Sequence, residues 1–132
     1  MRRAMSGLAL FRIVLGSVSW LAPGPVSRVF GVPEERITPE LEYMNRVFGV
    51  RAIALGVGYL ASSGKERSLW HRLWVMCDGA DTAMGTGMVA TGRLRGLSAP
   101  AALLTTGGAL AIDIAALATR RPGKRRWGSR PT

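Results

Sequence analysis

Cysteine and histidine are almost absent from this sequence, because Cys77 and His71 are the only residues of their kinds. A single cysteine excludes an intrachain disulfide and any cysteine-rich metal framework. The two residues lie six positions apart, on different faces of a helix, and no second histidine or cysteine completes a metal set. We therefore expect both residues to be structural, and we expect no metal site, no cofactor and no catalytic residue of the Ser/His/Asp kind.

Acidic residues are also scarce, with 8 Asp and Glu against 18 Lys and Arg, which gives a formal net charge of +10. So basic a chain would ordinarily suggest nucleic-acid binding. However, 16 of the 18 basic residues are Arg, and they are spread over apolar segments, short connections and one terminal run. No basic stripe on a polar helix emerges, so we expect no nucleic-acid partner.

Long polar stretches are missing, and four apolar windows occupy most of the 132 residues. A bilayer core about 30 Å thick needs about 20 mostly apolar residues in a helix. The windows are residues 4–22, 43–62, 69–90 and 99–119. We therefore predict an all-α protein, a four-helix transmembrane bundle with up-down-up-down topology, in which residues 1–119 form a single membrane domain and residues 120–132 a basic tail.

The connections between the windows support this organisation. Four prolines between the first two windows exclude a continuous helix there and leave room for one interfacial turn around residues 26–30. The other two connections are short enough to make consecutive spans antiparallel neighbours. The first window resembles a secretory signal, but Arg12 lies in its middle and no small-residue cleavage site follows, so we expect it to be a retained span.

Lysine and arginine counts predict the orientation of the bundle. With four spans both termini share a side, and that side collects 11 Lys and Arg near the span ends against 4 on the other. We therefore expect cytoplasmic termini in a bacterial inner membrane. We expect the basic tail to lean on anionic lipid headgroups.

The most informative feature is the set of charges inside the apolar windows. All three aspartates lie there, together with three arginines, so the charges at membrane depth sum to zero. A low-dielectric interior requires each such charge to have a partner. Their depths predict contacts of Arg51 with Asp81 and of Arg12 with Asp78 or Asp113, with Arg46 reaching Asp81. The predicted buried charge network comprises Arg12, Arg46, Arg51, Asp78, Asp81 and Asp113.

Three hypotheses remain for this network. Asp78 and Asp81 are three residues apart on one helix face, a spacing that suits acid/base chemistry or a cation relay as well as ion pairing. The first hypothesis is an ion-pair network that fixes helix packing. The second is a hydrated path for protons, ions or a solute, and the third is an enzyme site for a lipid or quinone.

Small residues at four-residue spacing predict where helix backbones approach each other. Such spacing occurs in the second, third and fourth windows. The predicted contact stripes are Ala54, Gly58 and Ser62; Gly79, Ala83 and Gly87; and Gly107, Ala111 and Ala115.

The stretch WLAPGPVSRVFGVPEE, followed by NRVFGVRAIALGVGYL and WHRLWVMCDGADTAMG, resembles a bacterial family of small four-helix membrane proteins of unknown function, and more distantly the DoxX-like group. The resemblance covers about the first two-thirds of the chain. It implies a four-helix membrane fold, and DoxX-like proteins are associated with quinone or thiol-redox contexts. The matching positions are Pro23, Phe30, Gly31, Pro33, Arg46, Phe48, Gly49, Arg51 and Asp78.

A chain this small exposes little polar surface outside a bilayer, so we expect its partners to bind through helix faces. The leading functional hypothesis is a non-enzymatic membrane component, either a homo-oligomer or an accessory subunit of a larger complex.

Overall fold

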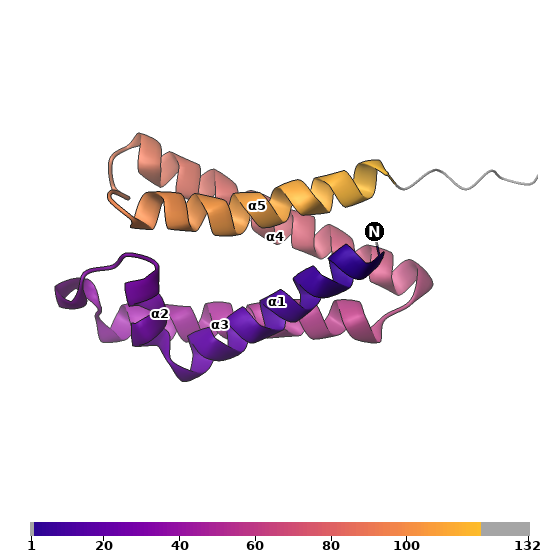
Figure 1. Ribbon diagram of the computed structural model, residues 1–132, viewed down its shortest axis with the longest axis horizontal. Helices are drawn as coiled ribbons and strands as arrows, with labels where there is room; N and C mark the ends of the chain where they lie inside the picture. Colours follow the sequence, from indigo (N-terminus) through magenta and orange to yellow (C-terminus); the bar gives the residue numbers. More distant parts are fainter. Residues whose placement is uncertain (1, 120–132) are drawn as a thin grey trace, which may run out of the picture.

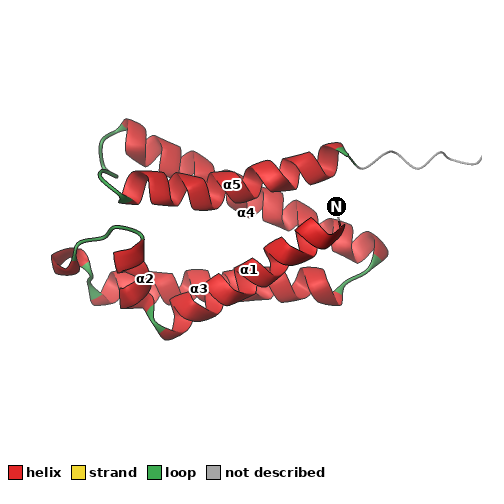
Figure 2. Cartoon of the chain, viewed as in Figure 1, coloured by secondary structure: helices red, strands yellow, loops and turns green. Residues whose placement is uncertain are grey.

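The computed structural model describes residues 2–119, and all of their regular structure is helical (Figures 1 and 2). No strand occurs among these residues, which confirms the all-α class. In chain order the elements are α1 (Arg2–Leu21), α2 (Pro23–Val29), the 3-10 helix η1 (Glu34–Arg36), α3 (Pro39–Ala61), α4 (Gly64–Ala90) and α5 (Ser98–Ala118).

The four long helices correspond to the four apolar windows, and all four begin before the predicted residue, α3 by four residues and α4 by five. Thr38 caps α3 by accepting a hydrogen bond from the Leu41 amide at 3.3 Å, and Pro39 takes the first helical position, where its missing N–H is tolerated. Helix α4 begins at Gly64, so most of the expected connection over residues 62–68 is helical.

The segment between α1 and α3 folds back onto the turn that joins α4 to α5. Pro23 and Pro25 lie in the first turn of α2, where proline is tolerated. Gly31 has a φ of 77°, and a Cβ there would lie 2.6 Å from the Cβ of Leu97. The Ser98 hydroxyl donates a hydrogen bond to the Gly31 carbonyl oxygen at 3.1 Å. Glycine at position 31 therefore allows two distant turns to touch at one end of the bundle.

The long helices are arranged as two packed pairs, α1 with α3 and α4 with α5, and the α3–α4 turn connects them (Figure 1). Glycines allow the close approach of α1 and α3. A Cβ on Gly16 would lie 2.5 Å from the Gly49 carbonyl oxygen, and a Cβ on Gly56 would lie 2.7 Å from the Ala9 carbonyl oxygen. The two backbones are thus in direct contact at these positions.

Most of the small-residue stripes predicted from four-residue spacing are wrong as helix contacts. Nothing lies within 4 Å of a Cβ built on Gly79 or Gly87, and Ala54, Ala83, Ala111 and Ala115 are exposed. Of the predicted glycines, Gly58 packs on the Trp70 ring and Gly107 approaches Thr82. Spacing alone did not determine which helix face meets a neighbour.

Two of the helices are long and apolar enough to cross a membrane: α1 over Arg3–Leu21 and α5 over Ser98–Ala118. Helices α3 and α4 do not meet the same criterion, so the predicted four-span membrane bundle is supported only in part. Charges explain the difference, because α3 contains Arg46 and Arg51 and α4 contains Asp78 and Asp81 within their apolar stretches.

Candidate functional site

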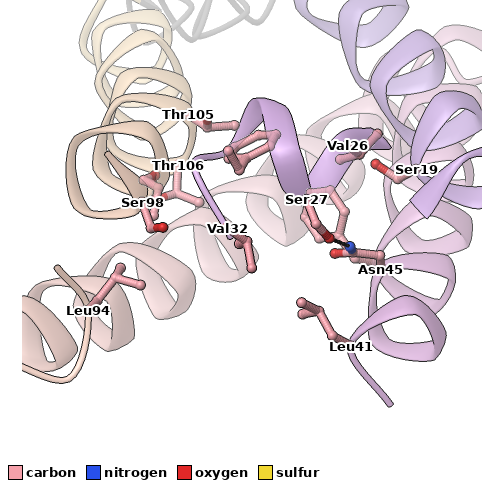
Figure 3. Close-up of a pocket in the computed structure, with 13 residues that line it drawn as sticks. Ser19, Val26, Ser27, Val32, Leu41, Asn45, Leu94, Ser98, Thr105 and Thr106 are labelled. Atoms are coloured by element: carbon pink, nitrogen blue, oxygen red, sulfur yellow. Dashed lines mark hydrogen bonds between the residues drawn. The ribbon is translucent and has the colours of Figure 1, made fainter. Parts of the chain in front are cut away.

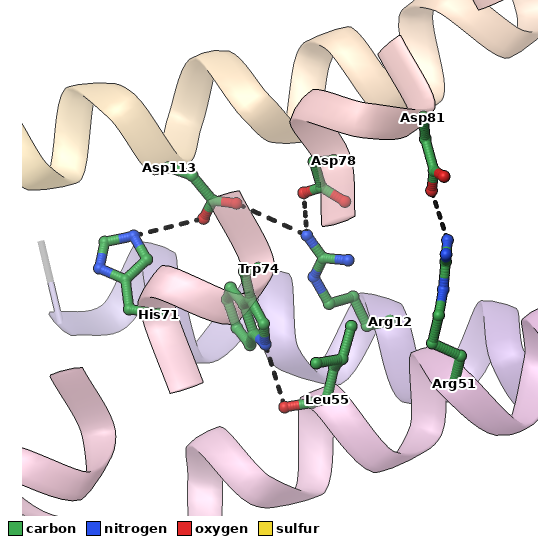
Figure 4. Close-up of polar contacts among 8 residues, drawn as sticks. All are labelled: Arg12, Arg51, Leu55, His71, Trp74, Asp78, Asp81 and Asp113. Carbon is green, nitrogen blue, oxygen red and sulfur yellow. Dashed lines mark hydrogen bonds and ion pairs between the residues drawn. The ribbon is translucent and has the colours of Figure 1, made fainter. Parts of the chain in front are cut away.

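Four ionisable side chains meet in the interior and form what we call the charge cluster: Arg12, His71, Asp78 and Asp113 (Figure 4). The Arg12 guanidinium is ion-paired and hydrogen-bonded to Asp78 and lies 3.6 Å from the Asp113 carboxylate. The His71 Nε2 atom lies 3.5 Å from the other Asp113 oxygen. His71 and Asp113 are completely buried. The cluster therefore joins α1, α4 and α5 in the interior.

Helical spacing brings the α4 members of this site together. His71, Trp74 and Asp78 follow one another at intervals of three and four residues, which places them on one face of the helix. The Trp74 ring is completely buried, and the Arg12 guanidinium carbon lies 4.6 Å from its centroid. Trp74 Nε1 donates a hydrogen bond to the Leu55 carbonyl oxygen at 3.1 Å. Trp74 thus fixes Arg12 by a cation–π contact and connects the cluster to α3.

A second pair lies next to the cluster and is more open to its surroundings. The Arg51 guanidinium is ion-paired to the Asp81 carboxylate, and these side chains are 41% and 29% exposed. Arg51 also lies over the Phe48 ring, at 5.4 Å from its centroid. This pair links α3 to α4, so the cluster and the pair together bridge all four long helices.

Three arginine contacts were predicted from the depths of the residues: Arg51 lies against Asp81 as expected, and Arg12, expected at Asp78 or Asp113, contacts both. Arg46 is exposed and makes no ion pair with any residue of 2–119, so the expected contact with Asp81 is wrong. Arg46 lies more than one helical turn before Arg51. Its side chain extends to the surface, as a long cation near a span end is able to do.

His71 is the member of the site that sequence reasoning missed. Its position near the predicted membrane interface suggested an isolated structural residue. The relevant signal was its spacing from Asp78, which is seven residues, or two helical turns on the same face. Asp113 was expected somewhat toward the same end of the bundle, and the fold brings it next to His71.

The formal charges of the cluster leave room for one proton. With neutral His71, one arginine and two aspartates sum to −1, and one proton on His71 or Asp113 makes the cluster neutral. Neither Asp113 oxygen accepts a hydrogen bond from the described residues, so its ion pairs carry the interaction. A buried group of net charge is unfavourable in a low-dielectric interior, which favours the protonated cluster.

The crevice directly beside the charges is small, and a wider groove of about 580 Å³ between α1 and α5 shares four lining residues with it: Leu8, Phe11, Thr105 and Ala109. The crevice beside Arg12, Asp78 and Asp81 has a volume of about 30 Å³. About 10 to 15 Å³ is needed for one water, so the crevice accommodates about two waters. Within residues 2–119, no three His, Cys, Asp or Glu side chains are grouped so that they could hold a metal ion. The arrangement can pair charges and hold a proton, and it has no room for an organic substrate.

The basic tail expected to contact lipid headgroups, residues 120–132, lies outside the described residues. No protein-family model, no curated protein and no solved structure matches this chain.

Proposed function

We propose that this chain is a small integral membrane protein of the bacterial inner membrane, in which α1, α3, α4 and α5 all cross the bilayer with cytoplasmic termini. The observation that carries the proposal is the burial of ionisable side chains beside the apolar core, together with the exposure of many large apolar side chains. The interior holds Arg12, His71, Asp78 and Asp113, whereas large apolar side chains cover the outside. Water-soluble proteins rarely expose extensive apolar surface or bury so many ionisable groups. The most exposed apolar residues of α1 and α5 include Leu10, Phe11, Val14, Leu21, Leu104 and Ile114.

The ion pairs explain how α3 and α4 enter a bilayer despite their charges. A central Asp or Arg costs about 2.5 to 3.5 kcal/mol on the insertion scale when it is unpaired. In this fold Arg51 pairs with Asp81, and Asp78 pairs with Arg12. We infer that α4 inserts against helices that already present their arginines, so the charges are offset during assembly.

Within the membrane, we propose a non-enzymatic role as a structural or accessory component, either a homo-oligomer or a subunit of a larger complex. The residues of the charge cluster contact one another, and the crevice beside them is too small for a lipid or quinone headgroup. The wider groove between α1 and α5 is lined by no charged residue, which disfavours the membrane-enzyme hypothesis, because that hypothesis requires a lateral pocket at Asp78 and Asp81. The exposed apolar faces of the four long helices are available to lipids and partner helices.

Extraction from membranes tests the location, and native mass spectrometry tests the role. We expect the protein to remain in the membrane pellet after alkaline carbonate treatment, whereas release into the soluble fraction would contradict membrane integration. Gentle release from its own membranes should show a homo-oligomer or co-release with larger subunits. A lone monomer under these conditions would contradict the accessory and oligomeric roles.

A second candidate function is proton transport, and one observation favours it. His71 adds a titratable group to Asp113, beyond what pairing with Arg12 requires. In proteoliposomes under a pH gradient, this hypothesis predicts proton flux that Asp113→Asn abolishes and Glu35→Gln, on the exposed 3-10 helix, leaves unchanged. Equal flux with wild type, Asp113→Asn and protein-free liposomes would remove it.

A further inference from the structure

A separate cavity of about 260 Å³ lies at the end of the bundle where α2 and the α4–α5 turn meet, away from the N-terminus (Figures 1 and 3). Its walls come from α1, α2, α3, α5 and the two turns described above. None of its lining residues is charged. The cavity is lined by Ser19, Val26, Ser27, Phe30, Val32, Leu41, Asn45, Phe48, Leu94, Ser98, Ala102, Thr105 and Thr106.

The hydroxyl of Ser19 distinguishes this cavity from an ordinary packing gap. Ser19 is 1% exposed, and its Oγ atom has no hydrogen-bond partner among the described residues. In Figure 3 this oxygen points toward the Val26 side of the cavity. A serine in a helix commonly donates to the carbonyl four residues earlier, and Ser19 does not.

The other lining hydroxyls are already engaged as donors. Ser27 donates to the Pro23 carbonyl oxygen, and Ser98 donates to the Gly31 carbonyl oxygen. Thr105 and Thr106 donate to carbonyls of their own helix. Ser19 therefore carries the one uncommitted hydroxyl donor among the cavity residues, and leaving it unsatisfied costs about 1 to 3 kcal/mol.

We propose that this cavity binds an uncharged, mostly apolar small molecule with one hydroxyl or carbonyl oxygen, which accepts a hydrogen bond from Ser19. The uncharged walls exclude an ionised ligand, because no counter-charge is present. A cavity of about 150 Å³ holds benzene, so this volume suits about ten non-hydrogen atoms. A lipid acyl chain fits the apolar walls less well, because it leaves the Ser19 hydroxyl unpaired.

The cavity and the charge crevice share three lining residues: Phe48, Thr105 and Thr106. The Arg51 guanidinium lies over the ring of Phe48. An occupant would thus lie one layer of side chains from the Arg51–Asp81 pair. The inference rests on the cavity and not on the proposed function, which membrane extraction tests separately.

The test compares two probes of equal size, 1-naphthol and 1-methylnaphthalene, on the full chain in lipid nanodiscs. Methyl NMR signals of Val26, Ala102 and Thr105 report occupancy of the cavity itself, as distinct from partition into lipid. We expect both probes to shift these signals, with 1-naphthol binding about tenfold more tightly, the equivalent of one hydrogen bond. Ser19→Ala should remove the difference between the probes, and Ser17→Ala on the same helix should preserve it.

Filling the cavity provides the second arm of the test. Ala102→Phe should abolish the methyl shifts of Val26 and Thr105 with both probes, and Thr106→Leu serves the same purpose if that variant does not fold. Equal affinity for the two probes in the wild-type chain would overturn the proposal and assign the cavity to lipid chains. Absence of any methyl shift, or an unchanged preference for 1-naphthol in Ser19→Ala, would also overturn it.

Discussion

Arg12 and Arg51 are paired with aspartates in the same interior, yet burial separates their energetic roles. The Arg12 side chain is 10% exposed and faces two carboxylates, whereas the Arg51 side chain is 41% exposed and faces one. Removing Arg12 leaves two buried carboxylates without their cation, whereas removing Arg51 leaves one carboxylate that is partly exposed. The stability of the fold should therefore depend more on Arg12 than on Arg51.

We expect Arg12→Ala to lower the free energy of unfolding in detergent by about 3 to 5 kcal/mol, because Asp78 and Asp113 both lose their cation. Arg51→Ala is the matched comparison, with an expected loss of up to about 2.5 kcal/mol, because it leaves the partly exposed Asp81 carboxylate unpaired at membrane depth. Reversible unfolding in mixed micelles measures both values. Similar losses for the two variants would show that burial does not set the strength of these pairs.

Trp74 offers a test that changes no charge. Trp74→Phe keeps an aromatic ring but removes the hydrogen bond to the Leu55 carbonyl oxygen and weakens the cation–π contact with Arg12. We expect a loss of about 2 kcal/mol from these terms and the lost volume. The control is Trp20→Phe, since Trp20 is 46% exposed and should tolerate the change. A stable Trp74→Phe variant would mean that Arg12 is held by its carboxylates alone.

At the scale of residues, the sequence predicts contacts between opposite charges better than it predicts contacts of neutral polar groups. Charges at similar membrane depth must find each other, and the contacts of Arg51 with Asp81 and of Arg12 with Asp78 and Asp113 follow from depth. His71 has no such requirement because it need not carry a charge, so its contact with Asp113 could be seen only in the folded arrangement. Arg46 does not need an ion pair either, because a long side chain near the end of a span can reach the surface instead of a buried carboxylate.

At the scale of helices, close approach is confined to a few glycines. Gly16 and Gly49 face each other across the α1–α3 contact, and a Cβ on either would lie within 2.5 Å of the carbonyl oxygen of the other. Backbone atoms have little freedom to move away, so any side chain there pushes the helices apart. This contact fixes the crossing of α1 and α3, the helices that carry Arg12 and Arg51.

Gly16→Ala should therefore destabilise the protein by about 1 to 3 kcal/mol through overpacking. Gly79→Ala is a sharp control, because nothing lies within 4 Å of its added Cβ and alanine is the better helix former. We expect Gly79→Ala to leave stability unchanged or to raise it by up to about 1 kcal/mol. The same unfolding measurement applies, and a neutral Gly16→Ala would contradict the direct backbone contact.

The predicted stripes failed because four-residue spacing occurs on every face of a helix rich in alanine and glycine. Rotation of each helix about its axis is set by its polar residues, which must turn inward in an apolar environment. In α5, Asp113 points inward, and this places Ala111 and Ala115 on the exposed side. Charged positions predict the rotation of each helix better than small residues do. Small residues allow close contact only where two backbones already meet.

For the molecule as a whole, the decisive question is whether α3 and α4 cross the bilayer with α1 and α5. Only α1 and α5 are apolar enough to qualify individually. If those two alone crossed, the whole of residues 22–97 would lie on one side, with the polar α3–α4 turn exposed beside the segment between α1 and α3. If all four cross, η1 and the α3–α4 turn lie on opposite sides of the membrane.

Cysteine labelling distinguishes these arrangements because Glu35 and Glu66 are both exposed, Glu35 in η1 and Glu66 in the first turn of α4, next to the α3–α4 turn. In a Cys77→Ser background, we expect a membrane-impermeant maleimide on intact spheroplasts to label Glu35→Cys and not Glu66→Cys. Disrupting the membrane should then allow labelling of both, which shows that Glu66→Cys is reactive. The expectation follows from Lys65, Arg67 and Arg72, which favour a cytoplasmic α3–α4 turn. Labelling of both positions on intact spheroplasts would instead support two spans. Asp78 would then lie outside the bilayer, and insertion of α4 would no longer explain why Asp78 is paired with Arg12.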